Sequence, residues 1–259
     1  MTRSPWIAPL AMLVCASAAA HADDLTYQLE TSVASSYVSR GIAQYADRDV
    51  ASNQNTATLR LDHVGPGALT LSTWSAVALS RYDDQPGTAL ELDVTASYAF
   101  NAGPIALSSG YIAYLFPAHA VGTPLDGGHE VFATASYDNP YVVPAVGVWV
   151  EPVRQLGAYV TLGASHDFHY KMCTLSPAIS VGAAAYRKYL GADQQATPHL
   201  NDVTAGLASR VDLDGGAYAA LRLSYALRTT PSDIMGSDEA WGMAGRSTLV
   251  AVVAVGVAR

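Results

Sequence analysis

The chain has 259 residues, of which 50% are hydrophobic and only 14% are charged, against about 25% charged residues in an average soluble domain. Its 14 Lys and Arg stand against 22 Asp and Glu, and a net charge of −8 leaves no basic surface for a phosphate backbone. This composition excludes a nucleic-acid binder, a coiled coil and a disordered tail. The 15 Tyr, 21 Gly and 13 Pro favour many short strands joined by turns, and two Cys exclude a disulfide scaffold.

The first 22 residues have the pattern of a secretory signal peptide. Arg3 precedes an apolar stretch at 6–14, and small residues then lead to Ala20-His21-Ala22, after which a signal peptidase would cleave. The apolar stretch is shorter than the roughly 20 residues that a membrane-spanning helix needs. We therefore expect residues 1–22 to be removed and residues 23–259 to form the exported domain.

Strict alternation of apolar and polar residues recurs along the rest of the chain. In 25–37 the odd positions are mostly apolar, from Leu25 and Tyr27 to Tyr37, while the even positions are mostly polar. In 90–100 the even positions carry Leu, Val, Ala, Tyr and Phe, and the odd ones carry mainly Glu, Asp, Thr and Ser. This pattern is typical of a strand whose two faces meet different solvents.

The alternation predicts about twelve strands, an even number as in bacterial outer-membrane barrels. They are expected at 25–37, 56–64, 68–82, 90–100, 104–116, 129–138, 143–151, 156–169, 174–187, 200–212, 216–228 and 247–258. Short connections (65–67, 101–103, 138–140, 212–216) alternate with longer ones (39–55, 117–128, 188–199, 229–246), although 83–87 and 152–155 are short where a long one is expected. Short turns at one end and long loops at the other are typical of such a barrel.

A strand in hydrocarbon must pair all its backbone groups, and only a closed sheet leaves no unpaired edge. Ten residues of strand span about 33 Å, which at a tilt of about 40–45° matches the apolar band of a membrane barrel. The expected periplasmic strand ends carry the aromatic residues of a girdle: Tyr27, Tyr98, Phe100, Tyr137 and Phe168. The sequence thus predicts one all-β domain, a closed antiparallel transmembrane β-barrel in the outer membrane of a Gram-negative bacterium. The alternative is a soluble sandwich whose core these aromatic side chains fill.

The polar faces of the strands would line the lumen of this barrel. Their charged residues are Glu30, Arg60, Asp62, Glu91, Asp93, Glu130, Glu151, Asp167, Asp202, Arg210, Arg222 and Arg228. Opposed acidic and basic walls would orient small polar solutes in a passive porin. Alternatively, Glu30, Arg60, Asp62 and Arg222 pair with one another and plug the lumen, because a barrel of this size lies between filled and open interiors.

Tyr37, Arg40 and Gly41 mark the point where the first strand meets a long loop. Gly41 suits a positive φ or a bulge. Arg40 has two interpretations: it contacts solutes at a constriction in the mouth, or it ties the loop 39–55 to a carboxylate on the wall. We favour the second.

Two other classes of function are alternatives to the porin. A lipid hydrolase needs a Ser nucleophile about 3 Å from a His base, and no histidine of the mature chain has Ser two positions on, so we expect no enzyme. A structural or adhesive barrel would use its loops, best 229–246, to contact partners. The residues 166–169 and the turn 212–216 lack the ligand sets of zinc and calcium sites, so no metal or cofactor is expected.

One stretch of the chain resembles a known family. Ser35-Ser36-Tyr37-Val38-Ser39-Arg40-Gly41-Ile42 is similar to the Ser-x-Tyr-x-x-Arg-Gly-Ile signature of the TorF-type porins of proteobacterial outer membranes. Later segments agree in order: Thr73-Trp74-Ser75, Glu91-Leu92-Asp93, Gly110-Tyr111 to Pro117, His129-Glu130-Val131 and Ser165-His166-Asp167-Phe168.

The resemblance implies a small exported barrel with a role in solute passage. The partners expected for such a protein are outer-membrane lipids and lipopolysaccharide, the barrel-assembly machinery and small polar solutes. Family barrels usually end in an aromatic residue that the machinery reads, whereas this sequence ends in Arg259. We therefore expect assembly by the usual route to be less efficient.

Overall fold

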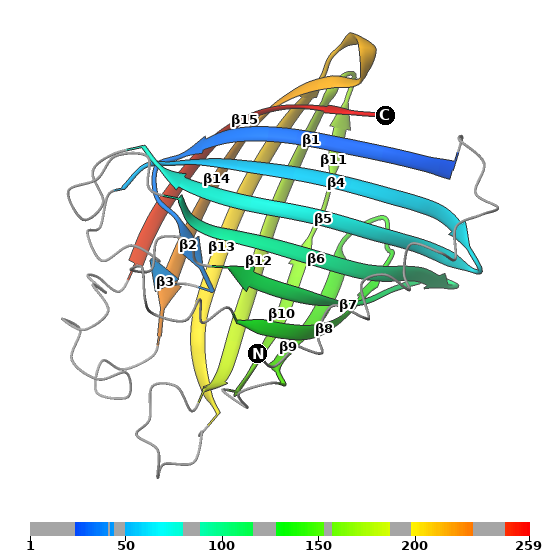
Figure 1. Ribbon diagram of the computed structural model, residues 1–259. Helices are drawn as coiled ribbons and strands as arrows, with labels where there is room; N and C mark the ends of the chain where they lie inside the picture. Colours follow the sequence, from blue (N-terminus) through cyan, green and yellow to red (C-terminus); the bar gives the residue numbers. More distant parts are fainter. Residues whose placement is uncertain are drawn as a thin grey trace, which may run out of the picture.

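The computed structural model describes residues 24–40, 42–43, 50–79, 89–115, 128–152, 157–186, 198–229 and 247–259. Its main feature is one antiparallel sheet in which twelve long strands each pair with the next (Figure 1). These strands are β1 (Leu25–Ala34), β4 (Ser52–Val64), β5 (Gly67–Ala78), β6 (Ala89–Ala102), β7 (Ile105–Leu115), β8 (His129–Tyr137), β9 (Val143–Glu151), β10 (Gly157–Ser165), β12 (Cys173–Tyr186), β13 (His199–Asp212), β14 (Ala217–Arg228) and β15 (Ser247–Ala258).

The sheet closes on itself, as predicted. β1 pairs with β15 over seven residue pairs, and β10 pairs with β12 from Gly157–Tyr186 to Ser165–Ala178. Neither the first nor the last of the twelve strands is therefore left with an unpaired edge. Within the described part of the chain, no helix is long and apolar enough to cross a membrane.

The connections divide the barrel into two ends. At the short-turn end, the chain turns at 65–66, 103–104, 138–142, 166–172 and 213–216. At the last of these, the short helix η3 (Asp214–Gly216) carries two glycines with φ of 75° and 82°, in the left-handed region that glycine adopts without strain. At the other end, here called the long-loop end, the connections are 35–51, 79–88, 116–128, 152–156, 187–198 and 229–246.

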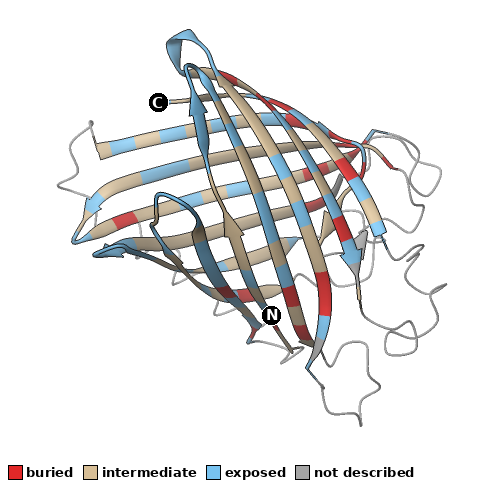
Figure 2. Cartoon of the chain, turned by 180° about the vertical axis from the view of Figure 1, so that it is seen from behind, coloured by how far each residue is buried: buried red, intermediate tan, exposed pale blue. Residues whose placement is uncertain are grey.

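The outward faces of the strands carry exposed apolar side chains. Leu162 is 65% exposed and Val253 is 60% exposed, and Figure 2 shows exposed positions recurring along the strands. Because these side chains lie on the outside of a single closed sheet, they form no core between two layers, which excludes the soluble sandwich. The aromatic residues expected in a girdle include four that are exposed near the short-turn end: Tyr27, Phe100, Tyr137 and Phe168.

Several predicted strand boundaries are wrong. The strand expected at 68–82 ends at Ala78. The strand expected at 56–64 begins at Ser52, and the one expected at 156–169 ends at Ser165. After it, β11 (Phe168–Tyr170) forms a separate hairpin extension that pairs with β12 only. The reason is that apolar alternation continues into this extension, so hydropathy alone does not mark where the barrel wall stops.

The first strand also ends earlier than predicted, at Ala34 rather than at Tyr37. Ser35 makes the last contacts with the wall: its N–H donates to the Ala251 carbonyl (2.8 Å), and its hydroxyl accepts from the Ala251 N–H (3.0 Å). Tyr37 then points into the barrel instead of outward, and its ring lies 4.9 Å from that of Trp74. The Ser35 hydroxyl takes the place of a backbone carbonyl as the acceptor for the neighbouring strand. The chain then leaves the sheet after this residue.

Candidate functional site

Residues 35–40, here called the inward segment, bring the first long connection into the barrel. Beyond β1 the chain forms a small hairpin of β2 (Val38–Ser39) and β3 (Ile42–Ala43) at the long-loop end (Figure 1). Arg40 lies in its turn with a φ of 51°, in the left-handed region that non-glycine residues seldom adopt. The predicted positive φ of Gly41 concerns a residue outside the described part of the chain.

The side chain of Arg40 crosses to the opposite wall and pairs with Glu130 of β8. Nη1 donates to Oε1 at 2.7 Å and Nη2 donates to Oε2 at 2.5 Å, so the two planar groups meet in a two-pronged ion pair. The Tyr114 hydroxyl of β7 also donates to Glu130 Oε2, at 2.6 Å. The Glu130 side chain is 9% exposed and that of Arg40 is 23% exposed, and such a shielded, two-pronged pair is both strong and directional. The geometry is that of the second interpretation, in which Arg40 ties the loop to the wall.

Two aromatic rings complete the surroundings of the Arg40 guanidinium. Its Cζ lies 4.8 Å from the ring centroid of Tyr159 on β10 and 5.9 Å from that of Trp149 on β9. Both distances are in the range of cation–π attraction. At the backbone, the Asn201 amide donates to the Arg40 carbonyl at 2.8 Å, so both ends of the residue are fixed.

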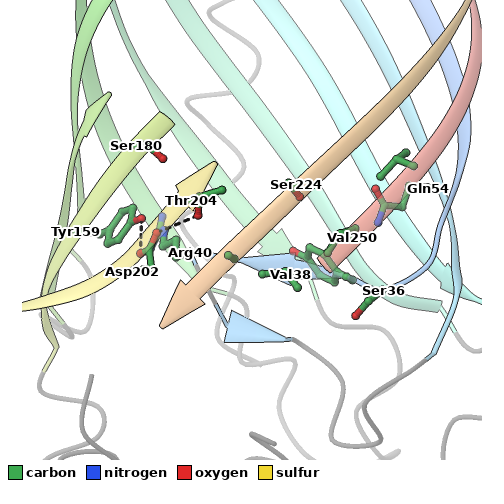
Figure 3. Close-up of a pocket in the computed structure, with 13 residues that line it drawn as sticks. Ser36, Val38, Arg40, Gln54, Tyr159, Ser180, Asp202, Thr204, Ser224 and Val250 are labelled. Atoms are coloured by element: carbon green, nitrogen blue, oxygen red, sulfur yellow. Dashed lines mark hydrogen bonds between the residues drawn. The ribbon is translucent and has the colours of Figure 1, made fainter. Parts of the chain in front are cut away.

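Asp202 on β13 organises the neighbouring wall. It is 2% exposed, and its Oδ2 accepts a hydrogen bond from the Tyr159 hydroxyl at 2.9 Å (Figure 3). The same oxygen accepts a second hydrogen bond from the Asn201 amide, also at 2.9 Å. Thr204 donates to the other oxygen at 3.4 Å. Asn201 and Asp202 are consecutive yet both buried, because a β-bulge inserts Asn201 between Leu200, which lies opposite Ala183, and Asp202, which lies opposite Gly182.

A glycine makes room for this arrangement. Gly182 lies opposite Asp202 in the register, and a Cβ at this position would collide with the Tyr159 hydroxyl and with Asp202 Oδ2. A residue without a side chain is therefore needed here for the Tyr159 ring to lie close to the β12 backbone beside Asp202.

An acidic patch lies near Arg40 on strand β6. Glu91 is buried, and Asp93 has one oxygen, Oδ1, that is buried and lacks a hydrogen-bond partner among the described residues. Burial, together with these two carboxylates, raises the pKa of Tyr37 well above its usual value, so the phenol stays protonated at neutral pH. The described side chains of this end thus include five inward carboxylates (Glu91, Asp93, Glu130, Glu151 and Asp202), of which Glu130 binds the guanidinium of Arg40 directly.

A cavity of about 360 Å³ adjoins the inward segment. Its walls include Tyr37, Arg40, Gln54, Tyr159, Asp202 and Ser224 (Figure 3). This volume lies at the lower end of the range for small-molecule sites. The polar side chains in its walls carry hydroxyls, an amide and charged groups, so the cavity suits a small polar molecule.

A second polar cluster lies nearer the short-turn end. Arg222 donates to both oxygens of Glu30 at 2.8 Å and 2.5 Å, and the Tyr218 hydroxyl donates to Glu30 at 2.9 Å. The guanidinium of Arg210 stacks 3.9 Å from the ring centroid of Tyr218. Arg60 pairs separately with Asp62, at 2.8 Å. The four residues of the predicted plug therefore form two separate pairs.

The pairing register places most of the predicted lumen residues on the inward face. Those whose side chains are described are Glu30, Arg60, Glu91, Asp93, Glu130, Glu151, Asp202, Arg210 and Arg222, and Asp62 joins them through its pair with Arg60. Asp167 does not lie on the barrel wall, because it is an exposed residue of the turn between β10 and β11. Arg228 occupies an inward register position opposite Asp202, but its side chain lies outside the described residues. Among the described residues, no group of three or more His, Cys, Asp or Glu side chains is placed to hold a metal ion.

Four residues of the site are not predicted from the sequence: Tyr114, Trp149, Tyr159 and Asn201. For the aromatic residues a signal was present, since each stands among polar or small residues at alternate positions of its strand, on the face expected to line the lumen. For Asn201 the sequence carries no such signal, because strict alternation places this residue on the outward face. Only the β-bulge turns its side chain inward.

No protein-family model matches the chain, and no curated protein matches it, so the resemblance to TorF-type porins stays a prediction. Solved structures do resemble it. An outer-membrane channel from Pseudomonas putida F1 has a TM-score of 0.54 at 8% identity, over 91% of this chain and 96% of that one. LpxR from Salmonella typhimurium has a TM-score of 0.52 at 10% identity, over 89% and 99%. The KdgM porin, solved in complex with disordered oligogalacturonate, has a TM-score of 0.51 at 9% identity, over 90% and 98%. At these identities the likeness shows a shared fold, the closed antiparallel barrel.

Proposed function

We propose that the chain is an outer-membrane β-barrel that acts as a narrow passive channel for small polar solutes, with the inward segment as its constriction. The observation that carries this proposal is the Arg40–Glu130 pair, which draws a loop from the wall of a closed barrel across its polar interior. A barrel that served only as a scaffold would not need a loop held inside by buried charges, which are costly to desolvate.

The outer surface supports a membrane location. Exposed leucine, valine and isoleucine side chains cover the strands, and exposed aromatic residues lie near the short-turn end. In water this surface would be a large apolar patch, whereas in a bilayer it meets acyl chains. The short-turn end, where β1 begins and β15 ends, would face the periplasm.

The charges inside the barrel favour cations over anions. Carboxylates predominate among the described side chains around the constriction, and a wall of one sign raises the local concentration of the opposite ion. Toward the short-turn end, the charges of Glu30, Arg60, Asp62 and Arg222 are balanced in pairs. Selectivity would therefore be set at the long-loop end.

The histidine contacts favour a channel over a lipid hydrolase. Among the described histidine side chains, His63 pairs with Asp24, His129 with the Tyr111 hydroxyl and His169 with Thr174, and the His166 ring packs against the Phe168 ring. None of these partners is a serine, so no Ser–His pair of the kind that activates a nucleophile is formed by them.

Reconstitution into a planar bilayer tests the proposal. The folded protein should give discrete conductance steps, and under a salt gradient the reversal potential should have the sign of a cation-preferring pore. Arg40→Ala should raise the conductance, because the inward segment loses its contact with Glu130, while Arg60→Ala, which removes a guanidinium near the short-turn end, should change it little. A folded barrel that gives no conductance steps with or without Arg40 would refute the channel.

A further inference from the structure

The partners of Arg40 form a site whose geometry matches a guanidinium group. Glu130 supplies a two-pronged acceptor from β8, and the rings of Trp149 and Tyr159 supply faces from β9 and β10. A carboxylate in the plane of the guanidinium with aromatic faces beside it is the arrangement that recognises this group. None of these three residues belongs to the inward segment, so the site is built by the barrel wall alone.

Each wall residue has contacts that do not depend on Arg40. Tyr114 donates to Glu130, Asp202 accepts the Tyr159 hydroxyl, and the ring of Trp149 stacks on Phe132 with a centroid distance of 6.4 Å. Trp149 and Tyr159 are also 5.9 Å apart by their centroids. The site therefore stays formed if the Arg40 side chain leaves it, and a preformed site binds without first paying to order its own side chains.

Arg40 reaches this site on a tether beside a cavity. The inward segment is fixed at Ser35 by the Ala251 backbone and at the Arg40 carbonyl by Asn201. The Arg40 guanidinium is therefore attached to a short segment that is held in place at both of its ends. The cavity of about 360 Å³ is lined by Arg40 and Tyr159 themselves, together with Asp202. A small solute in that cavity would lie next to the Arg40 guanidinium and next to Tyr159, which is one wall of the site that the guanidinium occupies.

We propose that Glu130, Trp149 and Tyr159 form a binding site for guanidinium-bearing solutes, and that Arg40 occupies it as a tethered competitor. This deepens the proposed channel function, because a solute would reach the site through the lumen. The ligand class follows from the chemistry. An anion would meet the carboxylates of Glu130 and Asp202, and a compact ammonium lacks the planar fork that binds both oxygens of Glu130 and stacks on an aromatic face.

Binding can be measured without any ion flux. Arg40→Ala protein, purified and folded in detergent micelles, is titrated with guanidinium chloride at low millimolar concentration, and binding is followed by tryptophan fluorescence, for which Trp149 is the local reporter. Sodium chloride at the same concentration controls for ionic strength, and urea is the neutral molecule of the same shape. Arg40→Gln, which keeps the length of the side chain without its charge, serves if the alanine variant does not fold.

We expect guanidinium, and neither urea nor sodium, to saturate the Arg40→Ala signal. In the wild type and in Arg60→Ala, binding should be about tenfold weaker or more, because a tethered competitor acts at an effective concentration in the millimolar range. In the double variant Arg40→Ala/Glu130→Gln the saturable signal should be lost. Equal affinity in wild type and Arg40→Ala, or saturable binding that survives in the double variant, would overturn the proposal.

A bilayer recording separates this proposal from the channel itself. If the Arg40→Ala pore conducts, guanidinium should reduce its current at concentrations at which urea does not. Saturable binding by a barrel that does not conduct would support the site and refute the channel. Conduction by Arg40→Ala without saturable guanidinium binding would support the channel and refute the site.

Discussion

Glu30 and Arg222 are 192 positions apart in the sequence, yet their side chains form a two-pronged ion pair inside the barrel. Glu30 lies on β1 and Arg222 on β14, and β15 runs between these two strands. On β15 the position opposite Glu30 is Gly256, which has no side chain to separate the two charged groups. The pair thus joins the first and the penultimate strand across the seam where the barrel closes.

We predict that Arg222→Ala lowers the free energy of unfolding by about 1–3 kcal/mol, because the Glu30 side chain, only 9% exposed, loses its charged donor and keeps Tyr218 as its partner. The measurement is reversible urea unfolding in lipid vesicles, followed by tryptophan fluorescence. Arg60→Ala is the control, since the Arg60–Asp62 pair is more exposed and should contribute less than about 1 kcal/mol. If both substitutions lower the free energy of unfolding equally, the Glu30–Arg222 pair has no special role in closing the barrel.

We predict that the double variant Glu91→Gln/Asp93→Asn reduces the cation preference of the pore by about twofold or more, because it removes the negative charge that the acidic patch carries near the constriction. The measurement is the reversal potential under a salt gradient. Asp212→Asn removes one charge at the short-turn end, on a half-exposed side chain, and should leave the reversal potential close to that of the wild type. If the reversal potential of the double variant is unchanged, the acidic patch does not set the selectivity.

The sequence predicted the wall of the barrel much better than its interior. Alternation and turn lengths gave the closed sheet and the inward direction of residues such as Glu91 and Glu130, because both depend on a local period of two. The partners of Arg40 depend on which strands meet across the lumen, and this is set by register and by the bulge at Asn201. Tyr37 shows the same limit, since it continues the apolar alternation of β1 after the chain has left the wall.

We predict that Gly182→Ala increases the conductance of the pore, because the added methyl group collides with Tyr159 and Asp202 and displaces the ring that lies against Arg40. The barrel should still fold, with a loss of about 1–3 kcal/mol from overpacking. The measurement is conductance in planar bilayers together with unfolding in vesicles. The control is Gly206→Ala, another inward glycine, where the added Cβ would meet only the Leu223 carbonyl at an ordinary distance of 3.7 Å. Gly182→Ala conductance equal to that of Gly206→Ala would mean that Tyr159 does not hold the constriction.

We predict opposite outcomes for arginine at two adjacent positions in the middle of β5. Leu71 points outward and is 48% exposed, whereas Ser72 faces the lumen in register with Thr58 and Thr95. If acyl chains cover the outer surface, Leu71→Arg should cost about 2–4 kcal/mol of folding free energy in vesicles, as expected for a charge near the bilayer midplane. Ser72→Arg should cost much less, because its guanidinium stays in water inside the barrel. Since both substitutions add the same side chain to the same strand, strand propensity cannot explain a difference between them. If Leu71→Arg were tolerated as well as Ser72→Arg, the apolar outer face would not lie in a bilayer, and the membrane location would have to be abandoned.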